Sequence, residues 1–171
     1  TDSLNHHTIH LLPGIYSSST NGENFPINLS SYVSIEGSGE EETILDGDSL
    51  TGILRFHYVT NSTVSNLTIK NGYASNGGGV YCHESSPTFK HVVISDNYAS
   101  DDGGGIFCHG STPIFKYVTI ANNRAINDGG GILLDKTNSI LENVRITNNT
   151  AGYGGGMCCW DNPSPTLLNV S

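Results

Sequence analysis

The tripeptide Gly77-Gly78-Gly79 decides the fold of this chain, because it returns at a nearly fixed spacing. Further copies lie at 103–105, 129–131 and 154–156, so the copies start 26, 26 and 25 residues apart. Each copy is followed by a short apolar run, a polar turn, a second strand-like run and then Asn-rich residues. A period of this length predicts a solenoid, in which each coil covers the open face of its neighbour.

Superposition of the repeats gives columns of equivalent residues. Because alternate residues of a strand share a face, five apolar columns are predicted to point into the coil. The columns are Leu67, Val92, Val118 and Val144; Ile69, Ile94, Ile120 and Ile146; Phe89, Phe115, Leu141 and Leu167; Val80, Ile106, Ile132 and Met157; and Cys82, Cys108, Leu134 and Cys159. Just after the isoleucines, Asn97, Asn123 and Asn149 predict a stacked ladder of amides at a bend.

The apolar runs are short, rich in β-branched residues and bounded by turn residues, and none has a helical period. We therefore expect an all-β chain, a right-handed single-stranded parallel β-helix with about 26 residues per coil and essentially no helix. Residues 1–171 are predicted to form one segment, with irregular coils over 1–63, a loop over 17–26 and regular repeats over 64–171. The next core isoleucine would fall just beyond Ser171, so we expect a longer solenoid with flanking domains.

Composition limits the classes of molecule that this protein is expected to bind. The formal net charge is −9 with only 7 Lys and Arg, which argues against nucleic acid and anionic membrane surfaces and permits cations such as calcium. No apolar run is long enough for membrane insertion. A hydrophobic content of 36% is too high for a disordered chain.

Two sets of residues carry a resemblance to known families. The stretch Ile94-Ser95-Asp96-Asn97-Tyr98-Ala99 and its successors at 120–125 and 146–151 resemble the repeats of secreted bacterial right-handed β-helix proteins. They are also similar to the repeats of polymorphic outer-membrane proteins, with Ile in place of Phe. The sequences Leu-Pro-Gly-Ile-Tyr (12–16) and Thr-Ile-Leu-Asp-Gly (43–47) resemble the opening coils of the pectate-lyase-like superfamily. The resemblance implies an extracellular or cell-surface location. It does not imply one activity, because the same scaffold occurs in lyases, hydrolases, adhesins and inert stalks.

The strand parity that buries Val80 and Cys82 exposes a ladder of aromatic and imidazole groups. Its members are Tyr81, His83, Phe107, His109 and Trp160, with Leu133, Asp135 and Cys158 also outward. Aromatic platforms suit the apolar faces of sugar rings, so a polysaccharide or surface glycan is one candidate ligand. The same strip also fits contact with another protein or a second copy, or cross-strand stacking without any ligand.

Metal binding has two candidate sites. His83 and His109 lie one coil apart and would place two imidazoles near one ion, although two ligands are too few and a plain surface stack is the favoured interpretation. Asp102 and Asp128 precede their glycine triplets at the same offset, and calcium with backbone carbonyls would relieve the repulsion of the stacked carboxylates. Solvated turn acids are the alternative, and no other cofactor is expected.

The cysteines allow two interpretations as well. Cys82 and Cys108 lie in adjacent coils, so they form either a disulfide or, because parallel side chains suit a disulfide badly, two free thiols of the core. Cys158 is predicted to point outward and to be the reactive thiol.

A catalytic interpretation depends on Asp46, Asp48 and Arg55, which are close in sequence and would form part of a sugar-cleaving cleft. The Asp-Gly-Asp segment is also a plain turn signal. Our leading hypothesis is therefore a non-enzymatic extracellular β-helix, a rigid stalk or an adhesin-like binding surface. The alternatives are a carbohydrate-active enzyme and a self-assembling solenoid.

Overall fold

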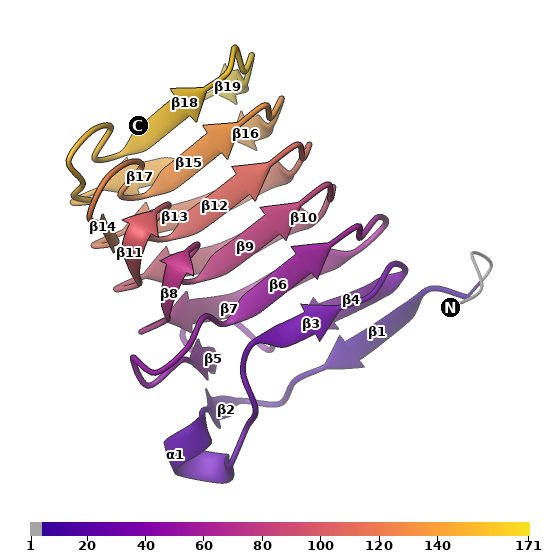
Figure 1. Ribbon diagram of the computed structural model, residues 1–171. Coiled ribbons are helices and arrows are strands. Elements are labelled where there is room, and N and C mark those ends of the chain that lie inside the picture. Colours follow the sequence, from indigo (N-terminus) through magenta and orange to yellow (C-terminus); the bar gives the residue numbers. More distant parts are fainter. Residues whose placement is uncertain (1–4) are drawn as a thin grey trace.

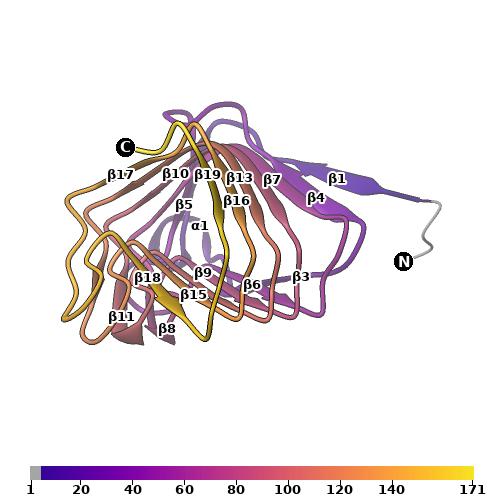
Figure 2. The same cartoon turned by 90° about the horizontal axis from the view of Figure 1, so that it is seen from above.

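The computed structural model describes residues 5–171 and shows a stack of coils in which the paired strands run parallel (Figure 1). The predicted parallel solenoid of about 26 residues per turn is confirmed. Viewed down the stack, the long strands of one sheet face a second sheet across the interior, and a third, short sheet lies beside the second (Figure 2).

The strands form three sheets. The ten-stranded sheet contains β1 (His7–His10), β2 (Gly14–Tyr16), β4 (Val33–Glu36), β5 (Thr43–Asp46), β7 (Thr63–Lys70), β10 (Thr88–Ser95), β13 (Ile114–Ala121), β16 (Ile140–Glu142), β17 (Arg145–Thr147) and β19 (Thr166–Leu168). The six-stranded sheet contains β3 (Ile27–Leu29), β6 (Leu54–His57), β9 (Val80–His83), β12 (Ile106–His109), β15 (Ile132–Asp135) and β18 (Met157–Trp160). The three-stranded sheet contains β8 (Tyr73–Asn76), β11 (Tyr98–Asp102) and β14 (Arg124–Ala125).

The register of the strands places equivalent residues of successive coils directly over one another. Ile94 pairs with Ile69 on one side and with Ile120 on the other, and Ile120 pairs in turn with Ile146. Phe89 and Phe115 also pair and stack with ring centroids 5.2 Å apart. Each coil therefore adds one side chain to every column, and the columns together form a single continuous core.

The middle coils are fully packed and the last coil is not. Phe89, Phe115 and Leu141 are buried, whereas Leu167, the fourth member of that predicted column, is 47% exposed. Cys159 is likewise exposed although it pairs in register with buried Leu134. Both residues keep the register of their predicted columns, but they are exposed because no further described coil covers them.

The amide ladder is confirmed at the bend after the isoleucines. The Nδ2 group of Asn97 donates to Oδ1 of Asn123 at 3.0 Å, and Asn123 repeats this bond to Asn149 at 3.0 Å. Each ladder Nδ2 also donates to the carbonyl of an isoleucine one coil earlier. The ladder satisfies buried backbone groups where the chain turns between sheets.

The loop predicted over 17–26 contains one helical turn, α1 (Ser18–Asn21). Ser17 caps its start by accepting a hydrogen bond from the Thr20 amide at 3.1 Å, and Gly22 ends it in the left-handed conformation. Composition indicated only a loop here, since residues 17–23 include no large apolar side chain. Within residues 5–171 no helix is long and apolar enough to cross a membrane.

Candidate functional site

The outer face of the six-stranded sheet carries two columns of side chains. On β6, β9 and β12 the residues alternate between the core and this face, and the strands pair in register. We call the first set the aromatic column and the second the histidine column. The aromatic column is Arg55, Tyr81, Phe107, Leu133 and Cys158, and the histidine column is His57, His83, His109, Asp135 and Trp160.

The accessible part of the aromatic column is shorter than predicted. The Arg55 guanidinium lies 5.2 Å from the Tyr81 ring centroid, and Tyr81 stacks on Phe107 at 5.5 Å with the rings 7° apart. Leu133, predicted to be exposed, is fully buried. The accessible platform therefore comprises the exposed Arg55 and the half-buried Tyr81 and Phe107.

A cavity of about 560 Å³ opens beside this platform, between β6, β9 and β8. Arg55 and Tyr81 line it from the six-stranded sheet, while Tyr73 and Asn76 line it from β8 and Leu50 from the preceding turn. Tyr73 is 44% exposed and stacks at 5.5 Å on Tyr98 of the next coil. We call this cavity the Arg55 pocket. It offers tyrosine rings from two different sheets together with a guanidinium.

The histidine column is a stack of nearly parallel rings. The centroids of His57 and His83 are 5.0 Å apart and those of His83 and His109 are 5.2 Å apart. The His109 Nδ1 atom lies 2.6 Å from Oδ2 of Asp135, which ends the stack. Trp160, in register with Asp135, is 38% exposed in the last coil. The metal site that His83 and His109 would share stays a prediction.

Sequence reasoning missed His57. The signal was present, because Phe56-His57 stands one coil before Cys82-His83 and Cys108-His109 in the same alternation. The coil that holds His57 has no glycine triplet, so superposition on the triplets did not reach it. Tyr58, which follows it, packs edge-on against the His57 ring at 4.4 Å.

The turn acids form hydrogen bonds with the backbone of the next coil. Asn76 Oδ1 accepts from the Asp102 amide at 3.2 Å, and Asp102 Oδ1 accepts from the Asp128 amide at 3.1 Å. Burial raises the pKa of Asp102, and the charge of neighbouring Asp101 adds to the shift. Across residues 5–171, no group of three or more His, Cys, Asp or Glu is placed to hold a metal ion. The calcium site at Asp102 and Asp128 stays a prediction.

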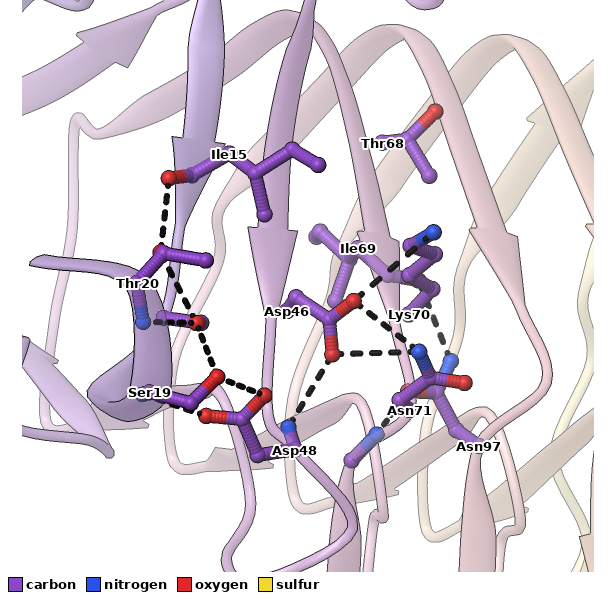
Figure 3. A network of polar contacts seen from close by, with 12 residues as sticks. Ile15, Ser19, Thr20, Asp46, Asp48, Thr68, Ile69, Lys70, Asn71 and Asn97 are labelled. Carbon is purple, nitrogen blue, oxygen red and sulfur yellow. Dashed lines mark hydrogen bonds and ion pairs between the residues drawn. The ribbon is translucent and has the colours of Figure 1, made fainter.

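The carboxylates of Asp46 and Asp48 accept hydrogen bonds from neighbouring parts of the chain (Figure 3). Both Asp46 oxygens accept from Asn71 Nδ2 at 3.0 Å, and Lys70 Nζ lies 3.7 Å from Oδ2. Asp48 accepts from the amide of Ser19 at 2.8 Å and from its hydroxyl at 2.9 Å, which lowers the Asp48 pKa. These carboxylates fix the turn after β5 and hold α1, and neither lines the Arg55 pocket.

The four cysteines are free thiols in the structure. Cys82 and Cys108 are buried and in register, and burial raises the pKa of the Cys82 thiol well above its usual range. Cys158 is half-buried, with its sulfur 3.9 Å from Asp128 Oδ1, and burial raises its pKa also. Cys159 is more exposed than Cys158, although sequence parity indicated the reverse.

Comparison with known proteins adds a family and two similar structures. The family model described as "Right handed beta helix region" matches residues 14–171. A pectin methylesterase from Yersinia enterocolitica is similar at 15% sequence identity and a TM-score of 0.50, over 85% of this chain and 63% of that one. A pectin methylesterase mutant in complex with a hexasaccharide matches at 10% identity and a TM-score of 0.40, over 90% of this chain and 72% of that one. No curated protein sequence matches significantly.

The similarity to the Yersinia enterocolitica protein is one of fold. At 15% identity the positions of individual side chains are not transferable. This chain also spans less than two thirds of the length of that enzyme.

Proposed function

Since the chain belongs to the right-handed β-helix family, we propose that it is an extracellular carbohydrate-binding β-helix that holds an acidic oligosaccharide in the Arg55 pocket without cleaving it. The extracellular location rests on the resemblance of the repeats to those of secreted proteins. The proposal of an acidic oligosaccharide as ligand rests on one observation, that two tyrosines and an arginine line the pocket.

The pocket lining matches the chemistry of a charged sugar. Tyr73 and Tyr81 present ring faces and hydroxyl groups, which suit the apolar faces and rimming hydroxyls of a pyranose. Arg55 adds five donors in a planar fork that matches a carboxylate. Among the described residues that line the pocket, Arg55 is the charged one, in a chain whose formal net charge is −9. The local charge therefore favours an anionic ligand.

Binding without cleavage is supported by the positions of the carboxylates. Glycoside hydrolysis requires a pair of carboxyl groups on either side of the scissile bond. The described residues that line the pocket include no Asp or Glu. Asp46 and Asp48, the acids that sequence spacing placed near Arg55, are bound to Asn71 and Ser19 instead.

The proposal is tested by titrating the protein with galacturonate oligosaccharides and with a neutral oligosaccharide of the same length, using calorimetry. Tyr81→Ala should weaken binding of both ligands about tenfold or more, because it removes a stacking ring. Arg55→Gln should weaken only the acidic ligand, by about 10- to 100-fold, which corresponds to a charge-assisted hydrogen bond of about 1.5–3 kcal/mol. Tyr117→Ala is the matched control, since Tyr117 is 49% exposed on β13 of the ten-stranded sheet and outside the pocket.

Two results would overturn the proposal. The first is equal binding of the acidic ligand by the protein and by both pocket variants. The second is a reducing or unsaturated sugar end that appears on incubation with the polysaccharide, because this result would establish the enzymatic alternative.

A further inference from the structure

The Arg55 pocket exists because the coil that holds β6 is shorter than the next coil. The two coils run together where the Tyr73 amide donates to the Thr51 carbonyl at 2.9 Å. They meet again where Leu54 of β6 pairs with Val80 of β9, after three steps of chain in the first coil and seven in the second. The short coil adds no strand to the three-stranded sheet, so β8 lies at the edge of that sheet (Figure 1). Residues 73–77, which include β8, all line the pocket, so the free edge of β8 is one of its walls.

Backbone groups on this edge of β8 are left without partners. On its other side β8 pairs with β11, where the Tyr98 amide donates to the Gly72 carbonyl at 2.8 Å. Backbone groups of alternate residues point to opposite neighbours in a parallel sheet, so those of Tyr73 and Ser75 point away from β11. In the described part of the chain, the Tyr73 carbonyl and both backbone groups of Ser75 have no hydrogen-bond partner. The edge therefore presents one free N–H donor and two free carbonyl acceptors.

Asn76 adds a side-chain donor to the same wall. Its Oδ1 atom accepts from the Asp102 amide at 3.2 Å, which fixes the orientation of the side-chain amide, because its nitrogen could not accept this bond. The Nδ2 group has no partner among residues 5–171, and Asn76 lines the pocket. In the next coil Asp102 holds the same position, and its Oδ1 atom accepts from the Asp128 amide at 3.1 Å. The position thus carries a neutral amide where it lines the pocket and a carboxylate one coil later.

The two walls of the pocket offer groups that one sugar can satisfy together. Arg55 supplies a guanidinium from β6, while Ser75 and Asn76 supply N–H donors from β8. A carboxylate accepts hydrogen bonds only, whereas a hydroxyl group both donates and accepts. A sugar ring that carries a carboxylate and hydroxyl groups can therefore pair with the donors of both walls and with the free carbonyls of the β8 edge.

We propose that the free edge of β8 binds the sugar that carries the carboxylate, and that Asn76 determines the preference for an acidic over a neutral ligand. The Ser75 N–H and Asn76 Nδ2 groups donate to the carboxylate together with Arg55, and the free carbonyls accept from sugar hydroxyls. This inference rests on the proposed function and narrows its ligand class to uronate oligosaccharides, in which one ring carries both kinds of group.

The first test is Asn76→Asp, titrated by calorimetry with galacturonate oligosaccharides and with a neutral oligosaccharide of the same length. The new carboxylate can still accept from the Asp102 amide, as Asp102 itself accepts from Asp128. It replaces the free donor with a negative charge, so the acidic ligand should bind about 10- to 100-fold more weakly. The neutral ligand should lose less than about fivefold, because a sugar hydroxyl can donate to the new carboxylate.

Asn138→Asp is the matched control for this variant. The Oδ1 atom of the exposed Asn138 also accepts from a backbone amide, that of Ser164 at 2.8 Å, and Asn138 does not line the pocket. The control adds the same charge to the protein and should leave both affinities unchanged.

The second test removes the Ser75 N–H and leaves Asn76 in place. Proline is tolerated on an edge strand where its missing N–H had no partner, so Ser75→Pro should keep the fold, which a thermal melt checks. It should bind the acidic ligand about tenfold or more weakly than Ser75→Ala, which retains the N–H group.

The inference requires both effects. Loss of no more affinity for the acidic ligand in Asn76→Asp than in Asn138→Asp would overturn it, and so would equal binding by Ser75→Pro and Ser75→Ala. Either result would leave the proposed function to its own variants at Arg55 and Tyr81. Absence of binding by the unmodified protein would overturn the proposed function together with this inference.

Discussion

Asn123 illustrates how a single residue holds two coils together. Its Oδ1 accepts from both the amide and the side chain of Asn97 at 3.0 Å, and its Nδ2 donates to Asn149 at 3.0 Å and to the Ile94 carbonyl at 2.9 Å. The residue is 1% exposed. Water cannot replace these bonds, so each partner depends on the amide.

Asn123→Ala should therefore destabilise the protein strongly. The change leaves the buried Asn97 amide without its acceptor and the Ile94 carbonyl without this donor, and we expect a loss of about 3–5 kcal/mol of unfolding free energy. Asn122→Gly is the matched control, because Asn122 is exposed with φ 56°, a conformation that glycine adopts freely. Denaturant melts should separate the two variants, and similar losses in both would contradict the ladder's role.

Asp102 is a residue whose charge opposes folding. Burial raises its pKa, so the folded protein holds a proton at this carboxyl more readily than the unfolded chain does. Its contribution to stability is thus most favourable below the ordinary pKa of an aspartate, and that contribution is lost as the pH rises through the raised pKa of the folded state. At pH 7 the ionised Asp102 carboxylate therefore lowers the free energy of unfolding.

Asp102→Asn should raise the melting temperature at pH 7. The Asn Oδ1 can still accept from the Asp128 amide, as Asn76 does for Asp102 one coil earlier. For a chain of this length we expect about 2–4 °C for each kcal/mol recovered. The gain should shrink toward pH 3, where Asp102 is protonated without any mutation. Asp161→Asn, which removes an exposed ion pair with Lys136, should change the melting temperature little at either pH. If Asp102→Asn raised the melting temperature equally at pH 7 and pH 3, the electrostatic cause would be refuted.

At the scale of the element, the glycine triplets let successive coils approach each other closely. A Cβ on Gly131, the third glycine of its triplet, would lie 2.4 Å from the carbonyl oxygen of Gly156 in the next coil. The equivalent Cβ on Gly156 would meet only Ile146 Cγ2, at 3.3 Å, because no described coil follows. The same motif position is thus crowded in one coil and open in another.

Gly131→Ala should cost about 2–4 kcal/mol, because backbone must shift to admit the methyl group. Gly156→Ala should cost less than about 1 kcal/mol. Thermal melts of the two variants check this prediction. Equal costs would mean that the triplet is required by its own turn and not by the neighbouring coil.

Sequence periodicity predicted the features that every coil repeats. The isoleucine column and the asparagine ladder follow from spacing alone, since one repeat fixes them all. Features that depend on a particular neighbour were not predictable in this way. Leu133 is fully buried where the parity of the strand exposes Tyr81 and Phe107, and α1 is held by Asp48 from 29 residues further along the chain. The Arg55 pocket likewise depends on the position of Tyr73 in β8, a strand that the sequence pattern did not predict.

For the whole molecule, the stack predicts that stability falls from the middle coils toward the C-terminal end. In a solenoid each coil is stabilised mainly by its two neighbours. Strands β10 and β13 are paired on both sides, whereas β18 and β19 are paired on one side among the described residues. Leu167 and Leu168 of β19 are 47% and 50% exposed, in contrast to fully buried Phe115 in β13. The last coil should therefore open before the middle ones.

Trp160 makes this opening measurable, because it is the one tryptophan of the chain and lies in β18. We expect its fluorescence to change at a lower denaturant concentration than the far-UV circular dichroism, which reports all the strands. Hydrogen exchange should agree, with amides of β10 and β13 protected at least about 100-fold more than those of β19. Coincident transitions and uniform protection would show instead that the coils unfold as one cooperative unit, in which case exposure of the last coil has no bearing on its local stability.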